Sequence, residues 1–293
     1  MSARVRGLGA PARLAAFAFG LALVGGIAAL AGAATGHGRV VAKDTHGGGE
    51  MAMEQMSPAE QSRASGLSSV AGGLSFVPAR TTLPAGKTQA FRFRLLDQQG
   101  KPVRNVDLDG GVRVHLIVVR RDFSGYQHVH PTLQHDGSWS VPLTLAAPGA
   151  YRVFADFEHK GKKTVLGHDV FVAGSFSPAP LAPVRTVARS DGYTINLSHD
   201  ALHANKATKL HFAISRNGRP VPAFHSYVGH RGHLVALRDG DLSYSHVHPE
   251  PDAKVGEIVF HTELPSAGKY RLFLQFKVAG VVHTAPFTVE VQR

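Results

Sequence analysis

Six histidines are the residues of this chain whose spacing best suits chemistry. They form two groups of three: His115, His128 and His130, then His233, His246 and His248. In each group the second histidine follows the first by thirteen positions, and the third follows two positions later. Neutral imidazole is a common nitrogen ligand of zinc and copper, so the repeated spacing predicts a metal site in each half of the chain.

These histidines belong to longer repeated segments that lie 118 residues apart. Residues 115–131 and 233–249 share the pattern His-Leu-x-x-x-Arg, followed by Tyr-x-His-x-His-Pro. Farther on, residues 148–154 and 267–273 share the pattern Pro/Ala-Gly-x-Tyr-Arg-x-Phe. Two motifs repeated at nearly one distance predict that the chain contains two copies of one domain.

The elements that must position the histidines are β-strands. From residue 73 onward apolar residues alternate with polar ones, as in residues 91–95 and 210–214, and Gly and Pro turns separate these runs. Seven short strands in about 100 residues are typical of an immunoglobulin-like sandwich. The sequence predicts an all-β fold with two tandem immunoglobulin-like β-sandwich domains, residues 73–175 and 185–293, joined by a stiff Pro-rich connector, residues 176–184.

Each repeated segment is predicted to form a hairpin. With a four-residue loop at residues 121–124, His115 lies opposite His130, and His128 lies on the same face. Opposed side chains have Cβ atoms about 4.5–5.5 Å apart and diagonal ones about 7–8 Å apart. Three imidazole nitrogens can therefore approach one ion at about 2 Å. The second copy, with its loop at residues 239–242, predicts the same arrangement.

The two faces of these hairpins have different expected roles. One face is predicted to join the sandwich core and carries Leu116, Val118 and Val129, then Leu234, Ala236 and Val247. The histidine face is also apolar, because it carries Ile117, Val119 and Tyr126, then Val235, Leu237 and Tyr244. An apolar face outside the core usually has a cover. We expect either the other domain or the preceding linker to provide it.

The N-terminal residues predict export. Arg4, Arg6 and Arg13 precede an apolar run at residues 14–34, which is typical of a membrane-insertion signal. The run is long enough to span a bilayer and ends in small residues that suit cleavage. Residues 1–34 are therefore either a signal peptide or a membrane anchor helix. In both cases the remainder of the chain is extracytoplasmic, either secreted or attached to the cytoplasmic membrane.

Residues 35–72 are predicted to form a disordered linker, rich in Gly, Ser, Ala and charge. This linker contains Met51, Met53 and Met56, with His46 close by. Thioether sulfur is a soft ligand that favours Cu(I). The alternative is a tether in which the methionines have no such role.

Composition excludes several classes of protein. Lys and Arg outnumber acidic residues by 32 to 21, but they are scattered and form no basic stripe with interleaved aromatic residues. Nucleic-acid binding is therefore not expected. The chain has no cysteine, which excludes disulfides, thiolate zinc sites, blue-copper centres and a lipoprotein anchor.

The repeated motifs resemble those of an actinobacterial family of uncharacterised exported proteins, over residues 73–293. In architecture each half is also similar to the immunoglobulin-like domains of periplasmic copper-handling proteins of the CopC and YtkA types. The second resemblance implies a role in copper handling outside the cytoplasm. The N-terminal histidine arrangement of mature CopC-type proteins is missing unless processing creates it, so their ligands are not transferred to this chain.

The leading interpretation is an exported metal-binding protein for copper sequestration or delivery, with a delivery partner protein and with zinc as the second candidate ion. The six histidines would hold the ions, and the three methionines would capture Cu(I) transiently. One alternative is a cell-surface structural or interaction module whose histidines serve packing or pH response. The other is a three-histidine zinc or copper metalloenzyme, but no Asp or Glu lies at a fixed spacing in both copies. No catalytic residue is predicted.

Overall fold

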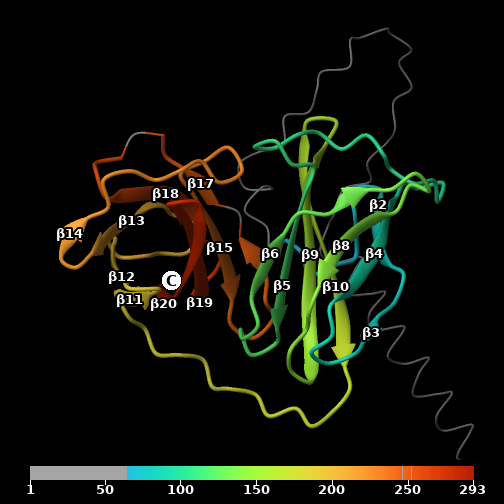
Figure 1. Cartoon of the computed structure of the whole chain (residues 1–293), viewed down its shortest axis with the longest axis horizontal. Coiled ribbons are helices and arrows are strands. Elements are labelled where there is room, and N and C mark those ends of the chain that lie inside the picture. The colour runs from blue at the N-terminus through green and yellow to red at the C-terminus, as the bar shows by residue number, and fades with distance from the viewer. Residues whose placement is uncertain (1–64, 246, 252) are drawn as a thin grey trace, which may run out of the picture. The chain divides into compact units, whose positions relative to one another are not determined.

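The computed structural model describes residues 65–245, 247–251 and 253–293, and all of its regular structure is β-strand (Figure 1). Within these ranges no helix is long and apolar enough to cross a membrane. The predicted signal or anchor at residues 1–34 lies outside the described residues, as do residues 35–64 of the linker predicted at 35–72; its last residues, 65–72, are described and include the short strand β1 (Val70–Ala71). The described chain thus agrees with the all-β prediction.

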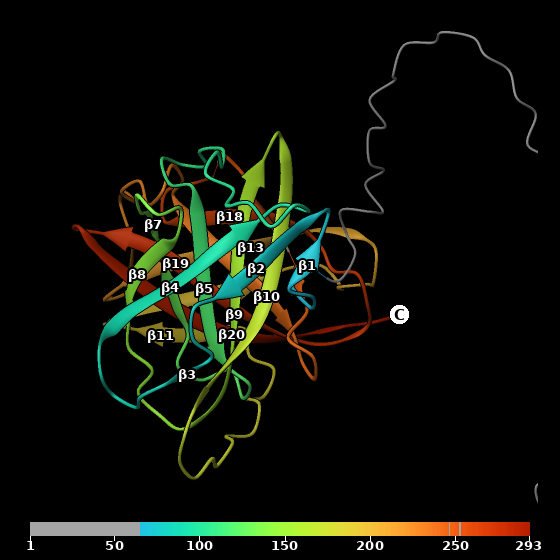
Figure 2. The ribbon, with the colours of Figure 1, turned by 90° about the vertical axis from the view of Figure 1, so that its right-hand side faces the viewer.

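The first repeat forms two facing sheets. One sheet has the order β1-β2-β4-β8-β7, with β1 (Val70–Ala71), β2 (Leu74–Pro78), β4 (Gln89–Leu96), β8 (Trp139–Leu143) and β7 (Thr132–Leu133). The other has the order β3-β10-β9-β5-β6, with β3 (Thr82–Leu83), β10 (Lys162–Val172), β9 (Gly149–His159), β5 (Val114–Arg120) and β6 (Gln127–Val129). Figure 2 shows β2, β4 and β8 crossing in front of β5 and β9. This strand order is that of an immunoglobulin-like sandwich.

The second repeat has the same strand order, except that in the described residues its second sheet has four strands and lacks a counterpart of β3. Its first sheet has the order β11-β12-β13-β18-β17, with β11 (Val187–Ser190), β12 (Tyr193–Ser198), β13 (Ala207–Arg216), β18 (Glu257–Glu263) and β17 (Val247–Pro249), and β14 (Arg219–Pro220) pairs with β13. Its second sheet has the order β16-β15-β19-β20, with β16 (Tyr244–Ser245), β15 (Gly232–Arg238), β19 (Gly268–Val278) and β20 (Val281–Val291). The predicted duplication is confirmed at the level of strand order.

Both domains contain a tyrosine corner at the repeated Tyr-Arg motif. The hydroxyl of Tyr151 donates to the carbonyl oxygen of Ala147 at 2.8 Å, and that of Tyr270 donates to the carbonyl of Ser266 at 3.1 Å. A tyrosine at the start of this strand that bonds back to the upstream backbone is a hallmark of immunoglobulin domains. The repeated motif therefore fixes the same corner twice.

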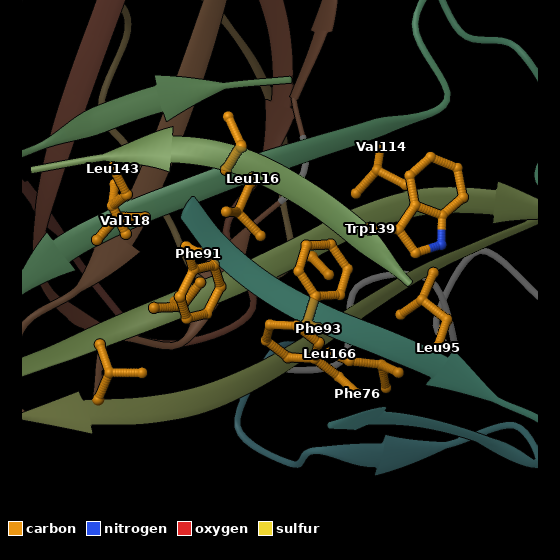
Figure 3. Packing of buried hydrophobic residues seen from close by; sticks show 14 of the residues in the cluster. Phe76, Phe91, Phe93, Leu95, Val114, Leu116, Val118, Trp139, Leu143 and Leu166 are labelled. Atoms are coloured by element: carbon orange, nitrogen blue, oxygen red, sulfur yellow. The ribbon is translucent and has the colours of Figure 1, made fainter. Parts of the chain in front are cut away.

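Each sandwich has its own apolar core. In the first core, Phe91, Phe93 and Trp139 pack with Leu116 and Leu166 (Figure 3). The hairpin residues predicted to face the cores do so: Leu116 and Val118 with Val129 beside them, and Leu234, Ala236 and Val247. Trp139 is 1% exposed, which identifies it as a core residue rather than an edge residue.

A third apolar cluster joins the histidine faces of the two domains. It contains Ile117, Val119, Phe123 and Phe154 from the first domain and Val235, Leu237, Leu242, Tyr244 and Phe273 from the second. The ring of Tyr126 stacks on that of Phe273, with centroids 4.0 Å apart. Each domain therefore covers the apolar face of the other. Ser65, which lies in the predicted linker, exchanges two backbone hydrogen bonds with Tyr244.

Candidate functional site

Two short hairpins present the repeated histidines. In the first, Leu116 pairs with Val129 and Ile117 with His128. In the second, Ala236 pairs with Ser245. Both registers are the predicted ones, because the spacing of the apolar residues and the short loops fixes which residues oppose each other.

The first histidine group converges on one point. The ligand nitrogens of His115, His128 and His130 all lie within 4.8 Å of one another. His115 Nδ1 is 2.9 Å from His128 Nε2, and His130 Nε2 is 3.3 Å from the same atom. Nitrogens bound at about 2.0–2.1 Å to a tetrahedral ion are roughly 3.3 Å apart. The spacing of this triad, His115, His128 and His130, suits a single ion.

A hydrogen bond from the second domain fixes the tautomer of His128. Its Nδ1 lies 2.7 Å from Oε1 of Gln275, while Gln275 Nε2 donates to the hydroxyl of Thr284 at 3.2 Å. With the amide oxygen facing His128 in this way, Nδ1–H of His128 is the donor. The lone pair of His128 is left on Nε2, the atom that faces His115 and His130.

The surroundings keep these imidazoles neutral. The pKa of His115 is lowered to about 4, mainly by burial and also by His233 and His130, although Asp156 opposes the shift. Loss of hydration also lowers the pKa of His128 well below its usual value, with His115 and His233 adding to the effect. The pKa of His130 is lowered by burial and by His233. Neutral imidazole is the form that binds metal ions.

The chain that carries the second histidine group takes a different path. After β16 the chain crosses to the opposite sheet, where β17 pairs with β18 and His248 lies opposite His261. The crossing comes earlier than in the first domain, where Val129 still pairs with Leu116 of β5, whereas its counterpart Val247 pairs with Thr262 of β18 and is buried in the second core. The predicted continuation of the hairpin to His248 is therefore not observed, and His246 lies outside the described residues.

His233 instead lies beside the first group. Its ring centroid is 5.5 Å from that of His115 and 5.4 Å from that of His128. Its Nε2 donates to the carbonyl oxygen of Tyr227 at 2.9 Å. The ring centroid of His230 is 5.7 Å from that of His233. The three predicted methionine ligands, Met51, Met53 and Met56, lie outside the described residues.

A cavity of about 270 Å³ lies beside the triad, and residues of both domains line it. Its polar lining includes Asp109, Asp156 and Lys163 together with His115, His128, His230 and His233. Asp156 is the cross-strand partner of His115, and Gln275 is that of His233. The Tyr244 hydroxyl donates to Asp156 at 2.9 Å. The space next to the triad is therefore polar and formed jointly by the two domains.

Sequence reasoning missed the polar neighbours of the triad. Asp156 and Gln275 occupy equivalent positions in strands that are otherwise apolar, and both are buried, at 8% and 6% exposure. A polar residue inside an apolar strand needs a hydrogen-bond partner, so this signal was present in the sequence. Asp109 and Tyr227 lie in connecting segments that carry no comparable signal.

Comparisons with solved structures find only distant similarity. No curated protein matches the chain. Among solved structures, the Escherichia coli adhesin FdeC is 16% identical over 75% of this chain and 64% of that one, with a TM-score of 0.25. A Salmonella alpha-2-macroglobulin is 15% identical over 74% of this chain and 15% of its own, with a TM-score of 0.27. Domains 5–6 of the S-layer protein SbsC are 14% identical over 75% and 96%, with a TM-score of 0.23.

The match to a domain family covers both repeats. Residues 69–174 and residues 186–293 each match the domain of unknown function DUF8832. These two ranges contain both hairpins, both tyrosine corners and the triad. The chain therefore belongs to the DUF8832 family, with two copies of the domain in tandem.

Proposed function

We propose that this protein is an extracytoplasmic two-domain β-sandwich module that holds one transition-metal ion with His115, His128 and His130. The supporting observation is the convergence of three imidazole nitrogens within 4.8 Å, with the lone pair of His128 directed at the other two rings. A binding site needs ligands that are close together, neutral and held in place, and the triad has all three properties.

Copper is the ion that we propose first, and zinc second. Sites built from imidazole bind Cu(II) more tightly than Zn(II) in the general order of divalent-metal affinities. Met51, Met53 and Met56 of the linker would add soft ligands for Cu(I). The corresponding role is sequestration of the ion or its delivery to a partner protein outside the cytoplasm, with residues 1–34 as the export signal or membrane anchor.

A second candidate function is a metal-free structural or interaction module at the cell surface. It is supported by the hydrogen bonds of the triad, in which His128 already bonds to Gln275, His115 and His130 without an ion. The large apolar cluster between the domains also holds them together by itself. In this alternative the histidines serve packing, and the chain acts as surface proteins such as an adhesin or an S-layer protein do.

Metal titration of the full chain, purified without a histidine tag, separates the two candidates. We expect the triple variant H115A/H128A/H130A to lose one tightly bound equivalent of Cu(II) or Zn(II) relative to wild type. The matched control replaces three histidines outside the triad, His203, His211 and His261, with alanine and keeps that equivalent. If wild type and the triad variant bind the same amount of metal, the metal-free module is the correct function.

A further inference from the structure

Building on the proposed metal site, we infer that the second domain controls the ion held by the first. Gln275 of β19 is a positioning residue for His128 of β6, so binding of the ion and docking of the two domains are coupled. The inference concerns regulation of the site, and its evidence is the set of contacts that cross between the domains.

The Gln275 side chain is built into the second domain. It is buried, at 6% exposure, and its Nε2 donates to Thr284 on the neighbouring strand β20. That bond anchors the amide group, whose Oε1 lies 2.7 Å from Nδ1 of His128. A fixed acceptor at this distance holds both the ring orientation and the tautomer of the histidine.

Loss of this acceptor should weaken the site without removing a ligand. When nothing accepts the Nδ1 proton, the ring of His128 can rotate and can carry its proton on Nε2 instead. That tautomer has no lone pair directed at His115 and His130. Removing the hydrogen-bond partner of a metal-binding histidine typically costs about 10–100-fold in metal affinity.

A second contact between the domains reaches another member of the triad. Tyr244 of the second domain donates its hydroxyl to Asp156, which is the cross-strand partner of His115. Two of the three histidines are thus supported, directly or through one neighbour, by side chains of the second domain. His130 follows β6 and is positioned by the same strand as His128.

Coupling of this kind acts in both directions. If docking of the second domain raises the affinity for the ion by some factor, the ion strengthens docking by the same factor. The ion should therefore slow hydrogen exchange of backbone amides in β16 and β19, which carry Tyr244 and Gln275. Neither strand contributes a ligand to the triad, so local stiffening of the ligands alone would not produce this protection.

The test uses two substitutions at one position. Gln275→Leu removes the acceptor, and we expect the Cu(II) dissociation constant, measured against a competing chelator, to rise about 10–100-fold. Gln275→Glu keeps an acceptor and should restore affinity to within a few-fold of wild type. Gln127→Leu is the matched control, because Gln127 neighbours His128 but donates to the Thr144 carbonyl instead, and it should leave the affinity unchanged.

Other outcomes overturn the inference in distinguishable ways. If wild type binds no ion at the triad, both this inference and the proposed function fail. If wild type binds the ion and both Gln275 variants match it, only the inference fails. Equal weakening by Leu and Glu would assign Gln275 a packing role and would also reject it. Should Gln275→Leu not fold, Thr284→Val removes only the anchor of the amide, and wild-type affinity in that variant rejects the inference.

Discussion

His115 of β5 and His233 of β15 lie beside each other between the two domains, with ring centroids 5.5 Å apart. They are the first histidines of the two repeated motifs, so the duplication has brought equivalent residues together. The repeat predicted two separate sites, one in each domain. Among the described residues the first motif forms the triad and His233 of the second motif lies beside it, while His246 of the second predicted site lies outside them.

The apolar contact between the domains should contribute strongly to stability. Phe273 is 3% exposed and stacks on Tyr126 across the interface. We expect Phe273→Ala to lower the free energy of unfolding by about 3–5 kcal/mol, because a buried aromatic ring is lost and a cavity remains. Urea denaturation measures this change.

Phe171 provides the matched control, since it is 48% exposed on β10. Phe171→Ala should change the free energy of unfolding by less than about 0.5 kcal/mol. Similar losses in the two variants would mean that the cluster between the domains does not stabilise the fold.

Tyr126 and Tyr244 occupy equivalent positions of the repeat, but we expect their substitution by Phe to have opposite effects on the free energy of unfolding. Tyr244 donates to the buried carboxylate of Asp156, so Tyr244→Phe should cost about 1.5–3 kcal/mol of unfolding free energy. The buried hydroxyl of Tyr126 has no hydrogen-bond partner among the described residues. Tyr126→Phe removes that unsatisfied group and should be neutral or stabilising. Thermal unfolding of both variants checks the pair, and a larger loss in Tyr126→Phe would contradict it.

Local patterns made much of the fold predictable. Alternating apolar residues identified the strands, and the short loops fixed the hairpin register that pairs Ile117 with His128. The same alternation separated core residues such as Leu116 from residues such as Val119, which pack against the other domain. Strand position and facing direction depend on residues close in sequence, so one chain suffices to infer them.

The parts that could not be predicted depend on contacts between distant residues. His128 and Gln275 are 147 positions apart, and nothing near either residue specifies the other. After its crossing to the opposite sheet, the second hairpin segment pairs with β18, where Val247 lies opposite Thr262. The two motifs keep the same spacing of His, Arg, Tyr and Pro residues, so that spacing alone does not specify the path of the chain.

The backbones of two loops, one from each domain, lie in close contact near the triad. A Cβ atom added to Gly110 of the first domain would lie 2.0 Å from the carbonyl oxygen of Val228 in the second. Val228 follows Tyr227, whose carbonyl holds His233. Gly110→Ala should therefore displace this turn and weaken both the fold and metal binding at the triad.

Gly86 is the control for that substitution. Its φ of +66° is close to the +60° of Gly110, but no atom lies within 4 Å of an added Cβ. Gly86→Ala carries only the cost of the left-handed backbone, about 1 kcal/mol, and should not affect metal affinity. If the two alanine variants have the same stability and the same metal affinity, the contact at Gly110 has no role in the site.

Acid should loosen the connector between the domains. The carboxylate of Asp122 accepts hydrogen bonds from Arg120, from Ser124 and from the backbone amide of Ala179 in the connector. Burial raises the pKa of Asp122, but these hydrogen bonds outweigh it and hold the pKa well below the usual value. A carboxyl group whose pKa is lower in the folded state stabilises the fold above its unfolded pKa, about 3.9, and loses that effect as the pH falls through its folded pKa.

Asp122→Asn should therefore be about 1.5–3 kcal/mol less stable than wild type at pH 7, and the difference should shrink steadily below about pH 4. Urea denaturation between pH 7 and pH 2 measures this convergence. Asp239→Asn, on an exposed turn of the second domain, is the control and should differ from wild type by less than about 0.5 kcal/mol. A constant gap between Asp122→Asn and wild type across this range would show that the charge of Asp122 does not hold the connector, because a purely steric defect does not depend on protonation.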